Sequence, residues 1–334
     1  MRKSLIIGCY FLAALGLASA PLASAAPQKA RSETVKQVKA GKAATKTVRK
    51  SGKKNVARRA IANARRDVQL SRASARPMAL EHPGLQSAGA LIINQLSGEV
   101  IYEKNADTIT PMASITKLMT AMVVLDANLP LNELISISSE DFDTLKGTSS
   151  RLAAGTTLTR GEMLLLALMS SENRAASALS RHYPGGHGAF IRAMNQKAAS
   201  LGMLHSKFFD ATGLNPGNVS TARELALMVK AARAYPEIQQ FSTSTEYHLT
   251  TPRGQTLTFR NTNPLVKSDD WEIGLSKTGY ISEAGRCLVM QTKINGAPVI
   301  MVLMDSDGKY TRIGDAQRVR KWMETSPAAK LHAG

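Results

Sequence analysis

The chain has 334 residues, 43% of them hydrophobic, which is enough for one large domain or two small ones. Its formal net charge of +18 suggests a nucleic-acid binder until the charge is placed along the chain. Residues 27–76 carry +14, residues 1–26 carry +2, and the remaining 258 residues carry only +2. The predicted globular part is therefore nearly neutral, which argues against a basic nucleic-acid-binding domain.

Residues 1–25 are typical of a secretory signal peptide. Arg2 and Lys3 precede an apolar stretch at residues 5–17, and small residues around Ala20 and Ala25 offer cleavage sites. No later segment has about 18 consecutive apolar residues, so no membrane span is expected. The sequence predicts an exported, periplasmic protein that is soluble or loosely associated with a membrane. Cleavage would leave Cys287 as the single cysteine, without an internal disulfide.

Residues 26–80 are predicted to form a disordered basic linker. The segment is rich in Lys, Arg, Ala, Ser and Thr and has no aromatic residue, so it cannot bury enough surface to offset its ordering entropy. Two interpretations stay open: a solvated spacer, or electrostatic contact with an anionic membrane or wall polymer. No nucleic-acid partner is expected, because the signal peptide sends the chain away from DNA.

The pattern becomes globular from about residue 85, and a catalytic domain is expected over residues 81–330. Residues 90–94 and 100–103 flank a turn and predict a β-hairpin. Helical periodicity follows in four segments, the second of them broken near residues 170–173 and the last opened by a capping box at Thr221 and Glu224. The expected helices span residues 112–126, 161–183, 190–201 and 221–234.

The apolar period then shifts towards two, which predicts strands. Strand candidates cover residues 246–250, 256–259 and 273–277, and a strong hairpin signal, Asn295-Gly296, joins residues 286–293 to 298–304. A last helix is expected over residues 312–324. This order predicts an α/β (α+β) fold: an antiparallel sheet flanked by helices, built from both ends of the chain, with a helical lobe inserted.

Three short motifs carry most of the chemistry. They are Ser114-Ile-Thr-Lys117, Ser171-Glu-Asn173 and Lys277-Thr-Gly279. The first alone is weak evidence, because Ser51–Lys54 and Ser306–Lys309 match the same pattern. All three in this order, the first on a helix and the last ending a strand, argue against coincidence. They supply a serine nucleophile, a lysine base, a polar relay and a second cation beside a glycine.

Each motif has a physical role. Ser114 and Lys117 share one helix face, and burial together with the charge of Lys277 is expected to lower the pKa of Lys117 so that it can act as a base. Ser171 and Asn173 are suited to relaying a proton and fixing Lys117, although the same residue types favour helix caps. The backbone N–H groups of Ser114 and Tyr280 are predicted to form an oxyanion hole, where one donor typically contributes about 3–4 kcal/mol to the transition state.

With these motifs, the chain resembles the low-molecular-mass penicillin-binding proteins, which are D-alanyl-D-alanine peptidases of the S11 type, over about residues 85–325. The strings from Ser171, from His182 and from Lys277 to Tyr280 are similar to the penicillin-binding protein 7 branch, known as D-alanyl-D-alanine endopeptidases. Glu172 departs from the glycine that the wider family more often has, and it suits this branch.

The resemblance implies a serine β-lactamase/DD-peptidase-like fold and an enzyme that cleaves D-alanyl peptide cross-links in peptidoglycan through an acyl-enzyme on Ser114. β-Lactams are then expected to be covalent inhibitors. For Arg312, binding of a substrate carboxylate and a solvated helix cation are equally good interpretations. The implied catalytic residues are Ser114, Lys117 and Ser171, and the implied substrate-binding residues are Asn173, Lys277, Thr278, Gly279, Tyr280 and Arg312.

Rival functions leave different traces in a sequence. Removal of terminal D-alanine, a carboxypeptidase activity, stays open because it also breaks a bond after D-alanine. A class A β-lactamase would need a Glu-x-x-Leu-Asn string, and a metallopeptidase a His-Glu-x-x-His string; the sequence has neither, and no metal or cofactor is expected. A non-catalytic wall- or β-lactam-binding protein would need a degraded motif, and none is degraded.

Overall fold

The computed structural model describes residues 82–251 and 254–326. The predicted signal peptide and basic linker, with the proposed linker contacts, lie outside the described residues and stay predictions. The limits of the predicted catalytic domain, 81 and 330, also fall outside them. Within the described part, no helix is long and apolar enough to cross a membrane.

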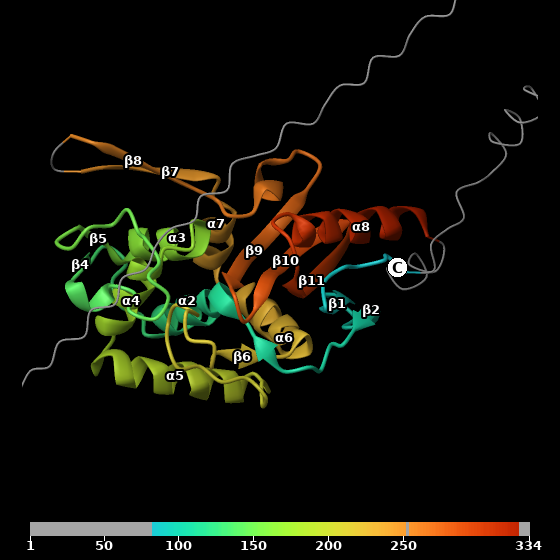
Figure 1. The fold of residues 1–334 in the computed structure, drawn as a ribbon, viewed down its shortest axis with the longest axis horizontal. Helices are drawn as coiled ribbons and strands as arrows, with labels where there is room; N and C mark the ends of the chain where they lie inside the picture. Colours follow the sequence, from blue (N-terminus) through green and yellow to red (C-terminus); the bar gives the residue numbers. More distant parts are fainter. Residues whose placement is uncertain (1–81, 252–253, 327–334) are drawn as a thin grey trace, which may run out of the picture. The chain divides into compact units, whose positions relative to one another are not determined.

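A five-stranded antiparallel sheet forms the frame of the molecule (Figure 1). Its order is β2-β1-β11-β10-β9, so the N-terminal hairpin pairs with the C-terminal strands through β1 and β11. This confirms the prediction of one sheet assembled from both ends of the chain. The strands are β1 (Gly89–Asn94), β2 (Val100–Lys104), β9 (Glu272–Ile281), β10 (Gly285–Ile294) and β11 (Ala297–Ser306).

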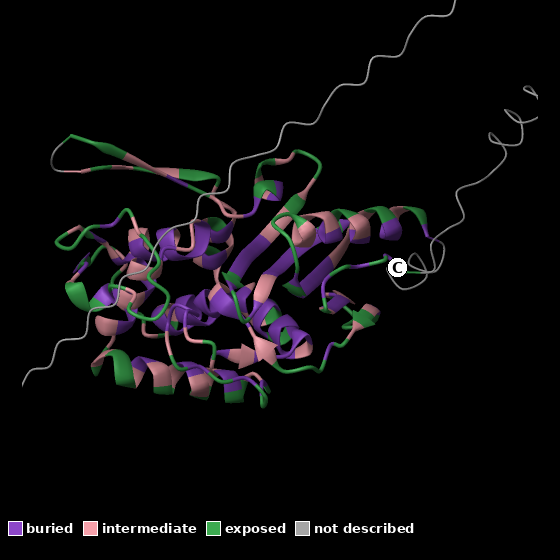
Figure 2. Ribbon diagram, viewed as in Figure 1, coloured by how far each residue is buried: buried purple, intermediate pink, exposed green. Residues whose placement is uncertain are grey.

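Both faces of the sheet are covered, since the central strands β10 and β11 are buried over six consecutive positions each. One face packs against α8 (Thr311–Thr325), whose Val319 and Trp322 contact a cluster containing Leu288 and Met301. The other face meets the helical lobe and shares its large apolar core. Figure 2 shows buried residues concentrated in the sheet and in the helices behind it.

The helical lobe lies between β2 and β9 in the sequence, as predicted. Its central helix is apolar on nearly every side, and residues 116–124 are all buried. That burial places a lysine inside the lobe. The helices are η1 (Ala113–Ile115), α2 (Thr116–Asp126), η2 (Ser139–Asp141), α3 (Arg160–Met169), α4 (Asn173–Arg181), α5 (Gly186–Ser200), α6 (Ala222–Ala232), α7 (Pro236–Thr243) and η3 (Pro264–Lys267).

The helical segment predicted over residues 161–183 is divided into α3 and α4, which confirms the break predicted near residues 170–173. The break falls at Ser170–Glu172, where Ser171 adopts a left-handed φ of 62°. The sequence pattern does not predict α7 (Pro236–Thr243), in which only Ile238 and Ser242 are buried. With so few inward positions, no apolar periodicity marks it.

Two of the predicted strands do not join the main sheet. β7 (Glu246–Thr250) and β8 (Thr256–Arg260) form a separate two-stranded hairpin that projects from the body (Figure 1). Of these ten residues only Phe259 is buried, so the hairpin has no apolar face of the kind that the strands of the main sheet bury. Two further short pairs complete the fold, β3 (Thr110–Pro111) with β6 (Val219–Ser220), and β4 (Leu134–Ser136) with β5 (Thr157–Thr159).

Candidate active site

The candidate nucleophile lies in a tight turn at the start of the buried helix. Ser114 is part of η1, a 3₁₀ turn that runs directly into α2. Ala113, just before it, has a left-handed φ of 47°, a strained conformation for a residue with a side chain. Ser114 is partly exposed, whereas Lys117 is fully buried behind it, and their Oγ and Nζ atoms lie 2.9 Å apart.

Lys117 can lose its proton near neutral pH, as a general base requires. Burial lowers its pKa to about 7, against the opposing attraction of Asp210 and Glu172. Its Nζ donates to Asn173 Oδ1 at 2.8 Å and to the Thr212 carbonyl at 2.7 Å. A neutral amine has two hydrogens, and both of these oxygens can only accept. The lone pair is therefore left for the Ser114 hydroxyl.

Burial is the largest cause of the lowered pKa of Lys117. The two buried lysines also repel each other, and burial together with the charges of Lys117 and Arg312 holds the pKa of Lys277 well below its ordinary value. Lys277 Nζ donates to Ser171 Oγ at 2.9 Å and to its neighbour's carbonyl, that of Thr278, at 2.7 Å.

The second motif divides its two polar side chains between the two lysines. Asn173 contacts Lys117, and Ser171 contacts Lys277. The left-handed turn at Ser171 separates the two, so the hydroxyl and the amide point to different partners. The hydroxyl of Ser171 thus accepts from Lys277, and its predicted relay of a proton between Lys117 and the leaving group stays a prediction.

The orientation of the Asn173 amide is fixed by a loop that the sequence analysis did not single out. Its Nδ2 donates to Thr148 Oγ1 at 3.1 Å, and the Thr148 hydroxyl donates to Asp143 Oδ2 at 2.7 Å. Since the one hydroxyl hydrogen goes to the carboxylate, Thr148 can only accept from Asn173. The amide oxygen is thereby turned towards Lys117.

We expect Thr148→Val to slow acylation of Ser114 by penicillin about five- to tenfold, because one hydrogen bond of about 1 kcal/mol orients the Asn173 amide. Thr148→Ser keeps the hydroxyl and should restore the rate. Stopped-flow acylation with a fluorescent penicillin measures both variants. Equal losses in the valine and serine variants would contradict a role for the hydroxyl.

Two acidic side chains, partly buried Asp210 and buried Glu172, support the site beside the groups already described. Asp210 accepts the backbone N–H groups of Thr212 and Gly213, which sets the turn that aims the Thr212 carbonyl at Lys117. Glu172 is buried, burial raises its pKa, and it accepts a hydrogen bond from Ser150 at 2.6 Å. For this turn, the sequence offers one local indication, the string Asp210-Ala-Thr-Gly, which is typical of an Asx turn.

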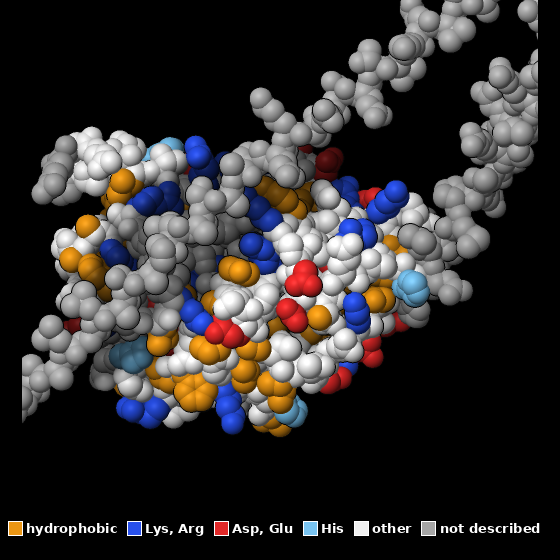
Figure 3. Space-filling view, in the orientation of Figure 1, with side chains coloured by type: hydrophobic (Ala, Val, Ile, Leu, Met, Phe, Trp, Pro, Cys, Tyr) orange, Lys and Arg blue, Asp and Glu red, His pale blue; other side chains and the backbone are white. Residues whose placement is uncertain are grey.

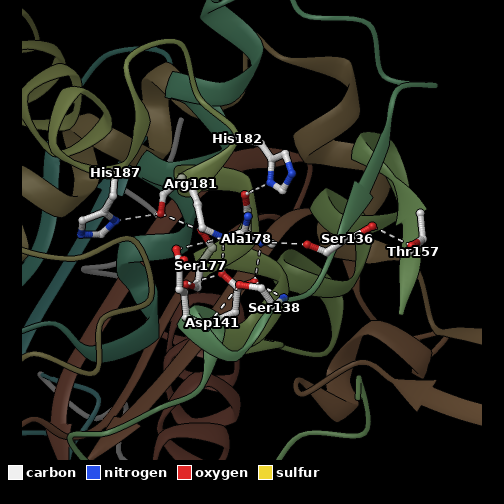
Figure 4. A network of polar contacts seen from close by, with 11 residues as sticks. Ser136, Ser138, Asp141, Thr157, Ser177, Ala178, Arg181, His182 and His187 are labelled. Atoms are coloured by element: carbon white, nitrogen blue, oxygen red, sulfur yellow. Dashed lines mark hydrogen bonds and ion pairs between the residues drawn. The ribbon is translucent and has the colours of Figure 1, made fainter. Parts of the chain in front are cut away.

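The helix that begins with Asn173 is anchored at its other end by a polar network (Figure 4). Arg181 donates to Asp141 Oδ2 at 2.8 Å and to the Ser136 carbonyl, and Ser177 also donates to Asp141. His187 contacts Ser180 across a neighbouring turn. In the part of the chain that the structure describes, no group of three or more His, Cys, Asp or Glu side chains could hold a metal ion.

The third motif lies directly against the nucleophile. A Cβ added to Gly279 would come within 3.0 Å of the Met112 carbonyl oxygen and 3.1 Å of the Ser114 nitrogen, so only glycine lets β9 approach this turn. Tyr280 follows at the strand end and is 55% exposed. The two peptide groups predicted for the oxyanion hole, at Ser114 and Tyr280, are thus brought to neighbouring positions.

Thr278 and Arg312 lie beside the same strand end. The Thr278 hydroxyl is 2.7 Å from that of Thr262. Arg312, at the start of α8, is partly buried and donates to the Gly279 carbonyl at 3.2 Å. Its buried Nε has no hydrogen-bond partner among the described residues. This position favours the carboxylate-binding interpretation of Arg312 over that of a solvated helix cation.

Comparisons with known proteins agree with this geometry. The model of peptidase S11, D-alanyl-D-alanine carboxypeptidase, matches residues 76–308. The chain is 51% identical to a D-alanyl-D-alanine endopeptidase of Escherichia coli, over 75% of this chain and 82% of that protein. It is 49% identical to one of Pseudomonas aeruginosa, over 75% of this chain and 81% of that protein.

Solved structures show the same fold. The Streptomyces K15 DD-transpeptidase matches with a TM-score of 0.68 at 29% identity, over 73% of this chain and 98% of that one. Penicillin-binding protein D2 of Listeria monocytogenes, in its cefotaxime-bound form, matches with a TM-score of 0.63 at 28% identity, over 71% and 97%. With the three motifs assembled around Ser114, the chain belongs to the peptidase S11 family of serine D-alanyl-D-alanine peptidases.

Proposed function

We propose that this protein is a serine DD-endopeptidase that cleaves D-alanyl cross-links in peptidoglycan and is inhibited by penicillin. The observation that carries the proposal is the Ser114 hydroxyl 2.9 Å from the buried amine of Lys117, whose pKa is about 7. The two relatives that are about half identical to it over three quarters of the chain are both named D-alanyl-D-alanine endopeptidases.

The reaction begins when neutral Lys117 takes the proton of Ser114 and the serine oxygen bonds to the D-alanine carbonyl carbon. The N–H groups of Ser114 and Tyr280 hold the negative oxygen that forms. The carbon–nitrogen bond then breaks, and the proton that Lys117 took from Ser114 passes to the leaving amine by way of the Ser171 hydroxyl, which Lys277 contacts at 2.9 Å. In the second half, water attacks the acyl-enzyme while neutral Lys117 takes its proton; the bond to Ser114 breaks, the acid is released, and Lys117 returns the proton to Ser114.

Substrate binding falls to the strand end and its neighbours. Asn173 positions the substrate amide as well as Lys117. The strand edge from Lys277 to Gly279 lies along the peptide, and Arg312 with the Thr278 hydroxyl takes the carboxylate beside the scissile bond. A penicillin carboxylate would use the same contacts, and its opened ring would stay on Ser114.

Carboxypeptidase activity is the second candidate, because the matching family model carries that description. It requires the same nucleophile and differs only in the leaving group. We further propose that the chain acts outside the cytoplasm, in the periplasm, since its proposed substrate lies there and residues 1–25 have the pattern of a signal peptide.

The test uses protein lacking the proposed signal peptide, with Ser114→Ala as a matched control. Each is incubated with purified cross-linked muropeptide dimers and, separately, with monomeric pentapeptide, and the products are separated by mass. We expect the dimer to be converted to monomers, with complete loss of this activity in the alanine variant and after penicillin treatment.

Two results would change the conclusion. Release of terminal D-alanine alone would replace the endopeptidase by a carboxypeptidase. Covalent penicillin binding at Ser114 without hydrolysis of either substrate would leave the nucleophile in place and make the proposed substrate wrong.

A further inference from the structure

The leaving-group side of the site carries a second arginine that the catalytic motifs do not include. Tyr280 of β9 and Arg286 of β10 are direct cross-strand partners, so their side chains share one face of the sheet. The Arg286 guanidinium stacks on the Tyr280 ring, 4.4 Å from its centroid. Thr278, two residues before Tyr280, lies on the same face.

This is the face that α8 covers, which brings Arg286 near Arg312. Leu288, two residues after Arg286, packs in the cluster that contains Ala316 and Val319 of α8. Arg312 lies in the first turn of α8 and reaches the Gly279 carbonyl. The two guanidinium groups are close enough for the charge of Arg286 to contribute, after burial, to the lowered pKa of Arg312.

Across residues 82–251 and 254–326, neither Arg286 nor Arg312 forms an ion pair. Glu283, in the turn before Arg286, is already paired with Lys146. Two neighbouring arginines, one partly buried and with a free Nε, destabilise the unliganded site and favour binding of anions. Figure 3 shows basic side chains on the face where the helical lobe meets β9.

We propose that Arg286, braced by Tyr280, binds a second carboxylate on the leaving peptide, beyond the one that Arg312 and Thr278 hold. The inference rests on the proposed function and names the class of leaving group: an acidic peptide with more than one carboxylate. A terminal D-alanine has a single carboxylate next to the scissile bond. Arg286 therefore contributes to cleavage of cross-links and not to removal of terminal D-alanine.

Arg286→Gln keeps a polar, though shorter, side chain and removes the charge. We expect kcat/KM for cross-linked dimers to fall about tenfold, mainly through a higher KM, as is typical when one charge-assisted contact to a substrate is lost. Turnover of monomeric pentapeptide and acylation by penicillin should stay within twofold of wild type. Lys293→Gln is the matched control, because Lys293 lies on the same strand and pairs with Glu272 at its far end.

The substrate provides the complementary arm of the experiment. Dimers whose leaving stem has its additional carboxylates converted to amides should be cleaved about tenfold more slowly by wild type. Arg286→Gln should cleave amidated and unmodified dimers equally well, because the contact is already gone. Thermal unfolding of each variant checks that the fold is retained.

Three results would overturn the inference. Equal losses on dimer and pentapeptide would make Arg286 a general support of the strand end. An unchanged rate on dimers would show that Arg286 does not contact the leaving peptide. If wild type cleaves pentapeptide but no dimer, the proposed endopeptidase function falls and this inference falls with it, whereas the first two results leave that function standing.

Discussion

Replacement of Lys117 by methionine is expected to reduce acylation of Ser114 at least about a thousandfold, at the upper part of the range for general-base catalysis. Methionine is unbranched and apolar, and it can occupy the buried channel of the lysine side chain without a charge. Among the residues that the structure describes, the Lys117 amine is the side-chain hydrogen-bond partner of Ser114, so the substitution removes the group placed to take the serine proton. Mass spectrometry of the penicilloyl-enzyme over time measures the loss.

The pH dependence of the wild-type protein follows from the same lysine. Because the pKa of Lys117 is about 7 and the neutral amine is the active form, the acylation rate should rise between pH 6 and pH 8 and then level off. Lys117→Arg tests whether a base or only a positive charge is needed at this position. Because arginine stays charged, this variant should be inactive at every pH in this range. The exposed lysine Lys207 provides the control, as Lys207→Met should leave the profile unchanged.

The free energy of unfolding should also depend on pH through the protonation of Lys117. Between pH 7 and the ordinary lysine pKa of 10.5, Lys117 binds fewer protons in the folded protein than in the unfolded chain. The free energy of unfolding therefore increases as the pH rises through this window. This contribution of Lys117 is complete above pH 10.5 and is lost as the pH falls towards 7. Relative to Lys117→Met, wild type should therefore become more stable at high pH; a pH-independent difference would contradict a neutral, buried lysine.

The sequence could reveal the catalytic motifs because their chemistry is local. Ser114 and Lys117 are three residues apart, and an amine next to a serine hydroxyl follows from helix geometry alone. The hairpin at Asn295-Gly296 and the sheet built from both chain ends were predictable for a similar reason, since turn chemistry and alternation act within a few residues. What each motif contacts across the site was harder to predict.

The groups that orient the motifs come from distant segments and carry weak local signals. The Thr212 carbonyl that contacts Lys117 is 95 residues away, and a backbone oxygen has no residue type by which to recognise it. Thr148 lies in an exposed loop whose composition is that of any polar turn. The contact between Ser171 and Lys277 depends on one left-handed residue at the helix break, and the residue type serine does not predict that conformation.

Gly213→Ala is expected to damage both folding and catalysis, although no motif contains this residue. Gly213 has a φ of +79°, and a Cβ there would lie 1.9 Å from the Ala113 carbonyl oxygen and 2.9 Å from the Ser114 nitrogen. Both neighbours are backbone atoms of the nucleophile turn, so the turn must move. We expect the free energy of unfolding to fall by more than about 3 kcal/mol, the sum of left-handed strain and overpacking.

Gly202→Ala supplies the matched control, because Gly202 has nearly the same φ, +77°, and a Cβ there would meet nothing within 4 Å. That variant bears only the left-handed strain and should lose about 1 kcal/mol without a change in acylation. Chemical denaturation and penicillin acylation, measured on both, separate strain from collision. In Gly213→Ala, a displacement of Ser114 by even 1 Å should slow acylation about a hundredfold in the molecules that still fold. Equal stability losses in the two variants would mean that the nucleophile turn accommodates the added methyl group without cost. A normal acylation rate in Gly213→Ala would show that the position of Ser114 does not depend on the close approach of Gly213.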